Sequence, residues 1–178
     1  MNTKQIAFIA AMISGAVMAN ANATDQGHGT VTFIGSIIDA PCSITPDTQD
    51  QTVKLGAISN AALENGGTKD GTSVPRDFVI KLENCTDATS QTVTTTFTGA
   101  EGATAGSLGI TGDAKGASII LTNGDGKQIK LGEATDPHML QDGDNTLLFS
   151  AYLKGDGATA TITPGDFTAI ADFTLAYQ

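Results

Sequence analysis

Residues 163–178, TPGDFTAIADFTLAYQ, alternate in character up to the last residue of the chain. One side of an extended chain would carry six apolar side chains: Phe167, Ala169, Ala171, Phe173, Leu175 and Tyr177. A period of two with aromatic residues predicts a β-strand that buries one face. Because chain ends are usually frayed or polar, a long apolar strand at this position leads us to expect another segment beside it.

Further β-like runs, separated by turn residues, precede this strand. They cover residues 30–38, 52–55, 78–82, 92–98, 118–122, 127–131 and 146–153, and the threonines of 92–98 are typical of an exposed strand. Asn123-Gly124-Asp125-Gly126 predicts a hairpin turn, and 57–64 predicts one short turn of helix. Many short strands predict an immunoglobulin-like β-sandwich, although the absence of Trp argues against an antibody-type core.

Residues 1–23 have the pattern of a cleaved secretory signal peptide. Lys4 precedes an apolar run over 6–18, and Ala-Asn-Ala at 21–23 matches a cleavage site, so the mature chain is expected to begin at Thr24. Loss of Lys4 leaves eight basic and 19 acidic residues, a formal charge of −11. A chain this acidic is not expected to bind nucleic acid or an anionic membrane surface. What remains is long enough for one domain.

The two cysteines, Cys42 and Cys85, are predicted to form a disulfide, because an exported protein meets oxidising conditions. The alternative is a metal pair or a reactive thiol. The only histidines are His28 and His138, and neither is near a cysteine in sequence, which disfavours a metal site.

No residue pattern predicts catalysis, a metal or a cofactor. Neither histidine has the spacing of a nucleophile–base pair, so both are interpreted as surface residues. Residues 142–145, Asp-Gly-Asp-Asn, lack the full ligand spacing of a calcium loop and are interpreted as a turn. The chain is therefore not expected to be an enzyme.

The N-terminal segment also alternates. Gly27, Gly29, Val31 and Phe33 fall on one side of an extended chain. Such an arm can add a strand to a neighbouring molecule, satisfying main-chain hydrogen bonds while alternate side chains fill its core. The alternative, that the arm pairs within its own sheet, remains open on periodicity alone.

The sequence resembles the pilins of the chaperone–usher pathway, most closely the kind that builds the rod of P pili. The resemblance runs over the mature chain, through the stretches at 29–33, 39–44, 55–56, 82–85, 140–145 and 165–178. Its most specific features are at the C-terminus, where the family has a glycine fourteenth from the end and an aromatic residue next to last. Gly165 and Tyr177 occupy these positions.

The resemblance implies an immunoglobulin-like sandwich that lacks its last strand. In this family a periplasmic chaperone lends a strand to the open groove, and at an outer-membrane usher the N-terminal extension of the next subunit replaces it. Residues 24–33 would then be the donor extension, with Gly27, Gly29, Val31 and Phe33 as inserting residues, and 34–178 the pilin domain. The groove edge and chaperone site would comprise Gly165, Phe167, Phe173, Leu175, Tyr177 and the carboxylate of Gln178.

The function implied is that of the major structural subunit of an adhesive surface fimbria, exported through the periplasm and carrying a tip adhesin at the end of the fibre. A minor adaptor or tip-associated pilin of the same pathway is the alternative, since it shares both chain ends. The alternative from another functional class is an exported β-sandwich enzyme. The absence of a residue pattern for a catalytic nucleophile and its base disfavours it.

Overall fold

The computed structural model describes residues 27–86 and 92–178. The predicted signal peptide, residues 1–23, and the first residues of the predicted donor extension, 24–26, lie outside them. The chain divides into two units, a leader that ends at Ile37 and a domain of residues Ile38–Gln178.

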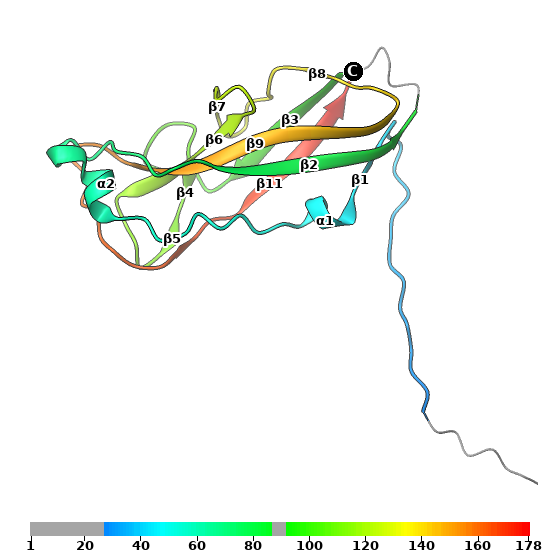
Figure 1. The fold of residues 1–178 in the computed structure, drawn as a ribbon, viewed down its shortest axis with the longest axis horizontal. Helices are drawn as coiled ribbons and strands as arrows, with labels where there is room; N and C mark the ends of the chain where they lie inside the picture. The colour runs from blue at the N-terminus through cyan, green and yellow to red at the C-terminus, as the bar shows by residue number, and fades with distance from the viewer. Residues whose placement is uncertain (1–26, 87–91) are drawn as a thin grey trace, which may run out of the picture. The chain divides into compact units, whose positions relative to one another are not determined.

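The larger sheet of the domain has the strand order β1-β2-β9-β6-β4, with β7 paired to β6, and every pairing is antiparallel (Figure 1). At its centre lie β2 (Arg76–Cys85), β9 (Gly143–Gly155) and β6 (Ala117–Asn123). The smaller strands are β1 (Ser43–Ile44), β4 (Leu108–Gly109) and β7 (Gln128–Ile129). We call this the large sheet.

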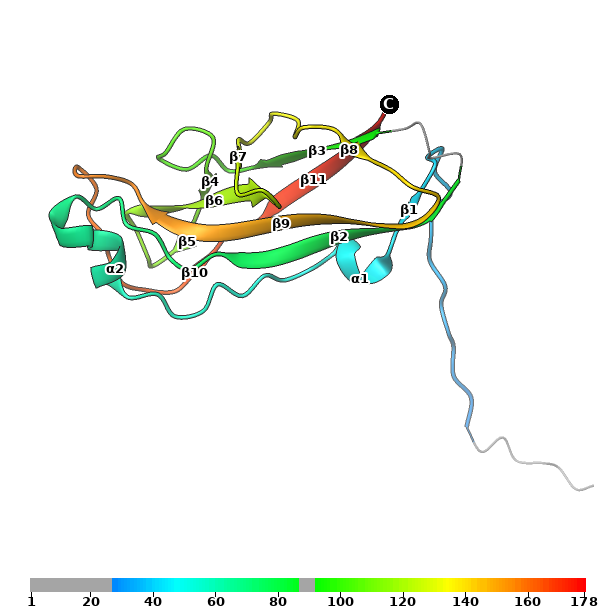
Figure 2. The ribbon, with the colours of Figure 1, turned by 45° about the horizontal axis from the view of Figure 1, so that its top comes forward.

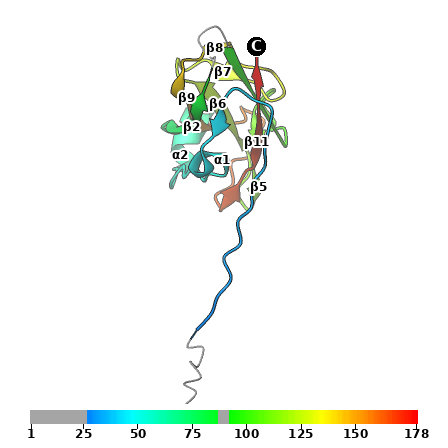
Figure 3. The same ribbon diagram turned by 90° about the vertical axis from the view of Figure 1, so that its right-hand side faces the viewer.

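The second layer is a three-stranded sheet with the order β11-β3-β8, here called the C-terminal sheet. It consists of β11 (Ala171–Tyr177), β3 (Thr92–Gly99) and β8 (His138–Met139). A small separate pair is formed by β10 (Phe167–Thr168) and β5 (Thr111–Gly112). In the end view, β2 and β9 lie in one layer and β11 in the other (Figure 3).

Short helices flank the sheets: α1 (Pro46–Gln49), α2 (Asn60–Glu64) and the 3-10 turn η1 (Asn65–Gly67). Between α1 and α2 the chain runs extended alongside β2 without joining a sheet, as both ribbon views show (Figure 2). Among the residues that the structure describes, no helix is long and apolar enough to cross a bilayer.

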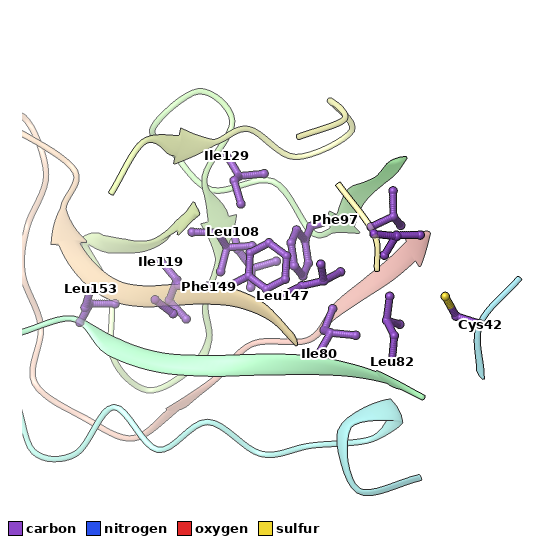
Figure 4. Packing of buried hydrophobic residues seen from close by; sticks show 14 of the residues in the cluster. Cys42, Ile80, Leu82, Phe97, Leu108, Ile119, Ile129, Leu147, Phe149 and Leu153 are labelled. Carbon is purple, nitrogen blue, oxygen red and sulfur yellow. The ribbon is translucent and has the colours of Figure 1, made fainter. Parts of the chain in front are cut away.

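The core lies between the two layers, where the period of two in each strand turns alternate side chains inward. Figure 4 shows Ile80 and Leu82 of β2 facing Phe97 of β3, with Phe149 of β9 between the sheets. Beside the core, Cys42 and Cys85 form a disulfide, and both are buried. The amide of Asn145 donates to Cys85 Sγ at 3.3 Å and to the Gln141 carbonyl at 2.7 Å.

The sandwich, the disulfide, the hairpin at 123–126 and the short helix within 57–64 are confirmed. In the hairpin, the Asn123 amide donates to the Lys127 carbonyl at 3.0 Å. The prediction of an exposed strand at 92–98 is wrong in its exposure, because Thr94 and Thr95 are buried. Thr95 faces inward opposite Leu175, and β3 is paired along both of its edges.

Two other strand predictions are wrong. Residues 30–38 and 52–55 are not in strands, although both are extended and alternating. The tail is also not one continuous strand, because β10 pairs with β5 while β11 pairs with β3, and the chain breaks between them at 169–170. Periodicity reports which side of an extended chain is apolar, but strand assignment requires a hydrogen-bonded neighbour.

Candidate functional site: an open groove beside β11

A long groove opens into the core between β11 and the extended segment 50–59. Its volume is about 1580 Å³, far more than a packed interior leaves empty. One wall comprises residues 162–173, which include β10 and the start of β11, and the other wall is the segment 50–59. The floor consists of inward side chains of the sheets, among them Phe78, Phe97, Leu108, Ile119, Leu121 and Leu153.

The groove exists because β11 is an edge strand. It pairs with β3 from Ala171↔Gly99 to Tyr177↔Val93, and no strand of the described residues pairs with its other side. The main chains of Thr92 and Gln178 exchange two hydrogen bonds, of 2.8 and 2.9 Å. Hydrogen-bonded pairs alternate along an antiparallel ladder, so the amides of Ala171, Phe173, Leu175 and Tyr177 point to the free edge.

The same four residues turn their side chains toward the core, yet each is only half-buried. Between them, Asp172, Thr174 and Ala176 are exposed. The alternation that the sequence predicts for 167–177 is therefore confirmed, but the inward face is incompletely covered. An edge with unpaired amides beside uncovered apolar side chains is a template for another strand.

An aromatic cluster lies in the floor of the groove. The rings of Phe97 and Phe149 meet edge to face at 5.1 Å between centroids, and those of Phe78 and Phe149 lie 5.5 Å apart. Phe173 approaches Phe97 at 6.4 Å. Phe78, Phe97 and Phe173 line the groove, so an inserted side chain would meet ring surfaces held by their neighbours.

The wall formed by segment 50–59 is held at few points. The amide Nε2 of Gln51 donates to the carbonyls of Thr48 and Val79, at 3.1 and 3.0 Å. Val53, Leu55 and Ile58 are partly buried and line the groove. Like the β11 edge, this wall combines partly buried apolar side chains with backbone that is not paired in a sheet.

Just before β10, the groove wall bends at Gly165. The amides of Asp113 and Ala114 both donate to the Asp166 carbonyl, at 3.0 and 3.2 Å. A Cβ added to Gly165 would lie 2.7 Å from the Ala114 nitrogen, so this close approach of two backbones excludes any side chain. Next to it, Phe167 packs against the core while lining the groove.

The predicted groove-edge residues are thus brought together along one line. Gly165, Phe167 and Phe173 line the groove, and Leu175 and Tyr177 continue the inward face of β11. Partial burial raises the pKa of the Tyr177 hydroxyl above its ordinary value near 10. Gln178 is tied to Thr92 through its main chain.

The predicted donor residues belong to the leader. Among its described residues, 27–37, no helix or strand is assigned. The side chains of Val31 and Phe33 are 75% and 90% exposed, and Ile34 and Ile37 are exposed as well. Four large apolar side chains are thus exposed on eleven residues of chain.

No cluster of three or more His, Cys, Asp or Glu side chains that could hold a metal occurs within 27–86 and 92–178. The charged side chains along the groove, such as Lys54, Lys115 and Asp172, sit in walls that are otherwise apolar or uncharged. The site is therefore suited to binding an extended apolar segment.

Two features of the site were not predicted from the sequence. The segment 50–59 forms a whole wall of the groove, and its sequence signal is the alternation of Val53 and Leu55, which predicts an ordinary strand. The aromatic floor of Phe78 and Phe97 carried no separate signal, because an inward aromatic residue looks the same in sequence whether the core above it is closed or open.

Comparison with known proteins agrees with this architecture. The family model described as fimbrial protein matches residues 31–178. The chain is 60% identical over 171 residues to the Fimbria A protein of Serratia marcescens, with 96% of each chain covered. It is 54% identical over 180 residues to the major MR/P fimbria protein of Proteus mirabilis, with both chains covered completely.

Solved structures give the same result. A chaperone–usher pilus solved to explain rod uncoiling matches with a TM-score of 0.75 and 35% identity, over 86% of this chain and 97% of that chain. The P pilus rod subunit PapA matches with a TM-score of 0.68 and 32% identity, over 78% of this chain and 100% of that chain.

An immunoglobulin-like sandwich that leaves a groove open beside its last strand defines the class of chaperone–usher fimbrial subunits. The chain belongs to the fimbrial protein family. It is a structural subunit of the major-pilin kind and not an enzyme, it assembles with other pilin subunits, and its place is in an extracellular surface fibre.

Proposed function

We propose that the groove beside β11 receives residues 24–33 of another copy of this chain as an added strand, and that repetition of this step builds the fibre. One observation carries the proposal: the inward side chains of β11 are half-buried and the amides of the same residues face an unpaired edge. An inserted strand would bury these side chains and accept hydrogen bonds from these amides in a single step.

The arm fits such a groove in composition. Insertion of alternate residues would place Gly27, Gly29, Val31 and Phe33 in the groove and leave Thr30 and Thr32 outside. Burial of an exposed Val or Phe side chain contributes about 1.5–3 kcal/mol each. The two glycines add no Cβ, so the strand can lie close where the groove is shallow.

The direction of donation determines the form of the product. The donor is the N-terminal arm and the acceptor is a different surface, so the contact is heterologous and each added copy leaves its own groove to be filled. Heterologous contacts that do not close produce an open filament.

Before assembly the same groove needs a cover, because it exposes apolar surface and an unpaired strand edge. We propose that a periplasmic chaperone supplies a temporary strand, contacting Gly165, Phe167, Phe173, Leu175, Tyr177 and the Gln178 carboxylate. An outer-membrane usher would then exchange that strand for the arm of the next subunit. In this scheme residues 1–23 are removed on export, residues 34–178 form the pilin domain, and the finished fibre carries a tip adhesin.

The test is a pair of matched variants of the full chain. Val31→Asp with Phe33→Asp places two carboxylates on the inserting side of the arm, whereas Thr30→Asp with Thr32→Asp places them on the other side. We expect the first pair to abolish fibre growth from this subunit while export and chaperone capture persist, and the second to form fibres. Removal of residues 24–33 should reproduce the first result, and unchanged fibre growth after that removal would refute the proposal.

A further inference from the structure

A second sheet edge of the domain is left short of a strand, and it lies on β2. β1 pairs with this edge at two positions, Ser43↔Glu83 and Ile44↔Leu82. Along residues 76–81 no other strand of the described residues pairs with the same edge. Because an unpaired edge is a template for an incoming strand, a donated arm has a candidate site here besides β11.

Side chains from α1 and its C-terminal flank occupy this edge. The amide of Thr45 donates to the Lys81 carbonyl at 3.0 Å, as in a strand. The amide of Lys81, however, donates to the hydroxyl oxygen of Thr48 at 3.1 Å. The side-chain amide Nε2 of Gln51 donates to the Val79 carbonyl at 3.0 Å. α1 thus lies beside the end of β2 that β1 also borders (Figure 2).

The chain leaves the edge because it turns into a helix. Pro46 begins α1, a position that suits its fixed backbone angle. The carbonyl of Thr45 then accepts the amides of Thr48 and Gln49, at 3.0 and 3.1 Å. Thr48 is 4% exposed, and its hydroxyl also donates to the Thr45 carbonyl at 3.3 Å. The hydroxyl that faces β2 is therefore held in place by the turn.

The two side chains fill the positions that a longer β1 would have filled. The register of β1, if continued, places Thr45 opposite Lys81 and Asp47 opposite Val79. In such a ladder the Lys81 amide would donate to the Thr45 carbonyl. The Val79 carbonyl would accept the Asp47 amide. The Thr48 hydroxyl and the Gln51 amide supply that acceptor and that donor instead.

We propose that Thr48 and Gln51 direct the donated arm to β11 by blocking the competing edge of β2. A strand that enters at β2 has to displace both side-chain hydrogen bonds before it forms its own. The ion pair between Lys81 Nζ and Asp47, at 3.3 Å, places charges at the same position, and charged side chains also discourage strand addition at an edge. This role rests on the proposed function, because it concerns the choice between two edges for one arm.

Counting bound strands tests the inference. The unassembled subunit is mixed with a peptide of residues 24–34 at a concentration that fills the groove, and native mass spectrometry gives the number of peptides per subunit. We expect one for the wild type and two for Thr48→Val with Gln51→Ala. The dissociation constant of the second peptide should fall by about 30-fold, since two hydrogen bonds no longer have to be displaced.

Two further variants separate edge blocking from a general disturbance. Thr146→Val with Gln141→Ala makes the same replacements at exposed positions that are not on this edge, and it should bind one peptide. Gln51→Ala alone changes an exposed side chain and leaves Thr48 in place. It should fold as wild type and bind the second peptide with intermediate affinity.

Hydrogen exchange of the Lys81 amide locates the second peptide. This amide should exchange slowly in the wild type, because Thr48 accepts its hydrogen bond. In the double variant Thr48→Val with Gln51→Ala it should exchange at least tenfold faster when one peptide is bound. Binding of the second peptide should slow it again.

The inference would be overturned by a double variant that binds one peptide while its Lys81 amide exchanges fast. A Lys81 amide that stays slow in that variant before the second peptide binds would overturn it as well. The proposed function fails in a different way, since a wild-type subunit that takes up no peptide in its groove gives a count of zero.

Discussion

Strands β9 and β11 have the same alternating pattern and different burial. Leu147, Phe149, Ala151 and Leu153 of β9 are all no more than 5% exposed, whereas the inward residues of β11 are half-buried. Hydrophobicity does not separate them, because both carry Phe and Leu on the inward side. The difference is in their neighbours: β9 lies between β2 and β6, and β11 has β3 alone.

The domain thus has two parts that differ in completeness. We call the large sheet around β9 the finished half, and the edge of the C-terminal sheet at β11 the unfinished half. Around β9, the inward side chains are buried and the strand is paired along both of its edges. In the unfinished half, β11 has inward residues that are as apolar as those of β9, but it lies at the border of the groove. On the proposed function, a strand that enters the groove would gain the stability missing there, and this would link the fold to assembly.

The largest effect is expected in the finished half. Phe149→Ala removes a ring 4% exposed that contacts Phe78 and Phe97, so it should lower the free energy of unfolding by about 3–5 kcal/mol. Urea unfolding of the subunit would measure it. Leu148→Ala, at the exposed neighbouring position of β9, is the control and should cost under about 0.5 kcal/mol.

Next in size is the disulfide, which fastens β2 to the chain just before β1. Replacement of both Cys42 and Cys85 by Ala avoids a free thiol and should lower the free energy of unfolding by about 2–4 kcal/mol. Subunit yield in the periplasm should fall with it. Two free thiols found by mass measurement in native fibres would contradict this account of the finished half.

Phe173→Ala distinguishes the two halves most clearly. Because Phe173 is only half-buried, its truncation should cost the unassembled subunit about 1–2 kcal/mol, less than Phe149→Ala. With a peptide of residues 24–34 in the groove the cost should rise, since the inserted strand completes the burial. Thr174→Ala is the control and should show no such dependence on the peptide. An equal cost for Phe173→Ala with and without peptide would mean that the groove is not the binding site.

The smallest effect concerns Tyr177. Its pKa is raised by partial burial, so the folded state holds the hydroxyl proton more tightly than the unfolded state. The resulting stability is fully present below the unfolded pKa near 10 and is lost as the pH rises through the higher folded value. Absorbance titration should show Tyr177 ionising later still when the peptide fills the groove, and Tyr177→Phe identifies its contribution beside Tyr152. A pKa unchanged by the peptide would contradict insertion next to Tyr177.

Much of this was predictable from the sequence, and what was not has a physical reason. The inward residues of β11, the disulfide and the hairpin at 123–126 follow from periodicity, compartment and turn chemistry. The wall at 50–59 did not, because extended chain with alternating Val53 and Leu55 appears the same whether or not a neighbour pairs with it. The prediction that the strand 92–98 is exposed was wrong for a similar reason: threonine does not show in the sequence whether a neighbouring sheet covers it, and Thr95 faces inward opposite Leu175.

The groove itself could be expected only through the resemblance to pilins. No local pattern records the absence of a neighbouring strand, because that is a property of the whole topology. Gly165 illustrates the point: its position was predicted by family pattern, and the structure supplies the reason in the close approach of the backbone at Ala114.

Amide hydrogen exchange along β11 tests the central claim most directly. In the unassembled subunit, the amides of Asp172, Thr174 and Ala176 are bonded to β3 and should exchange slowly, while those of Phe173, Leu175 and Tyr177 should exchange fast. In the fibre both sets should be slow. Fast exchange of the second set in the fibre, or uniform protection before assembly, would contradict the account.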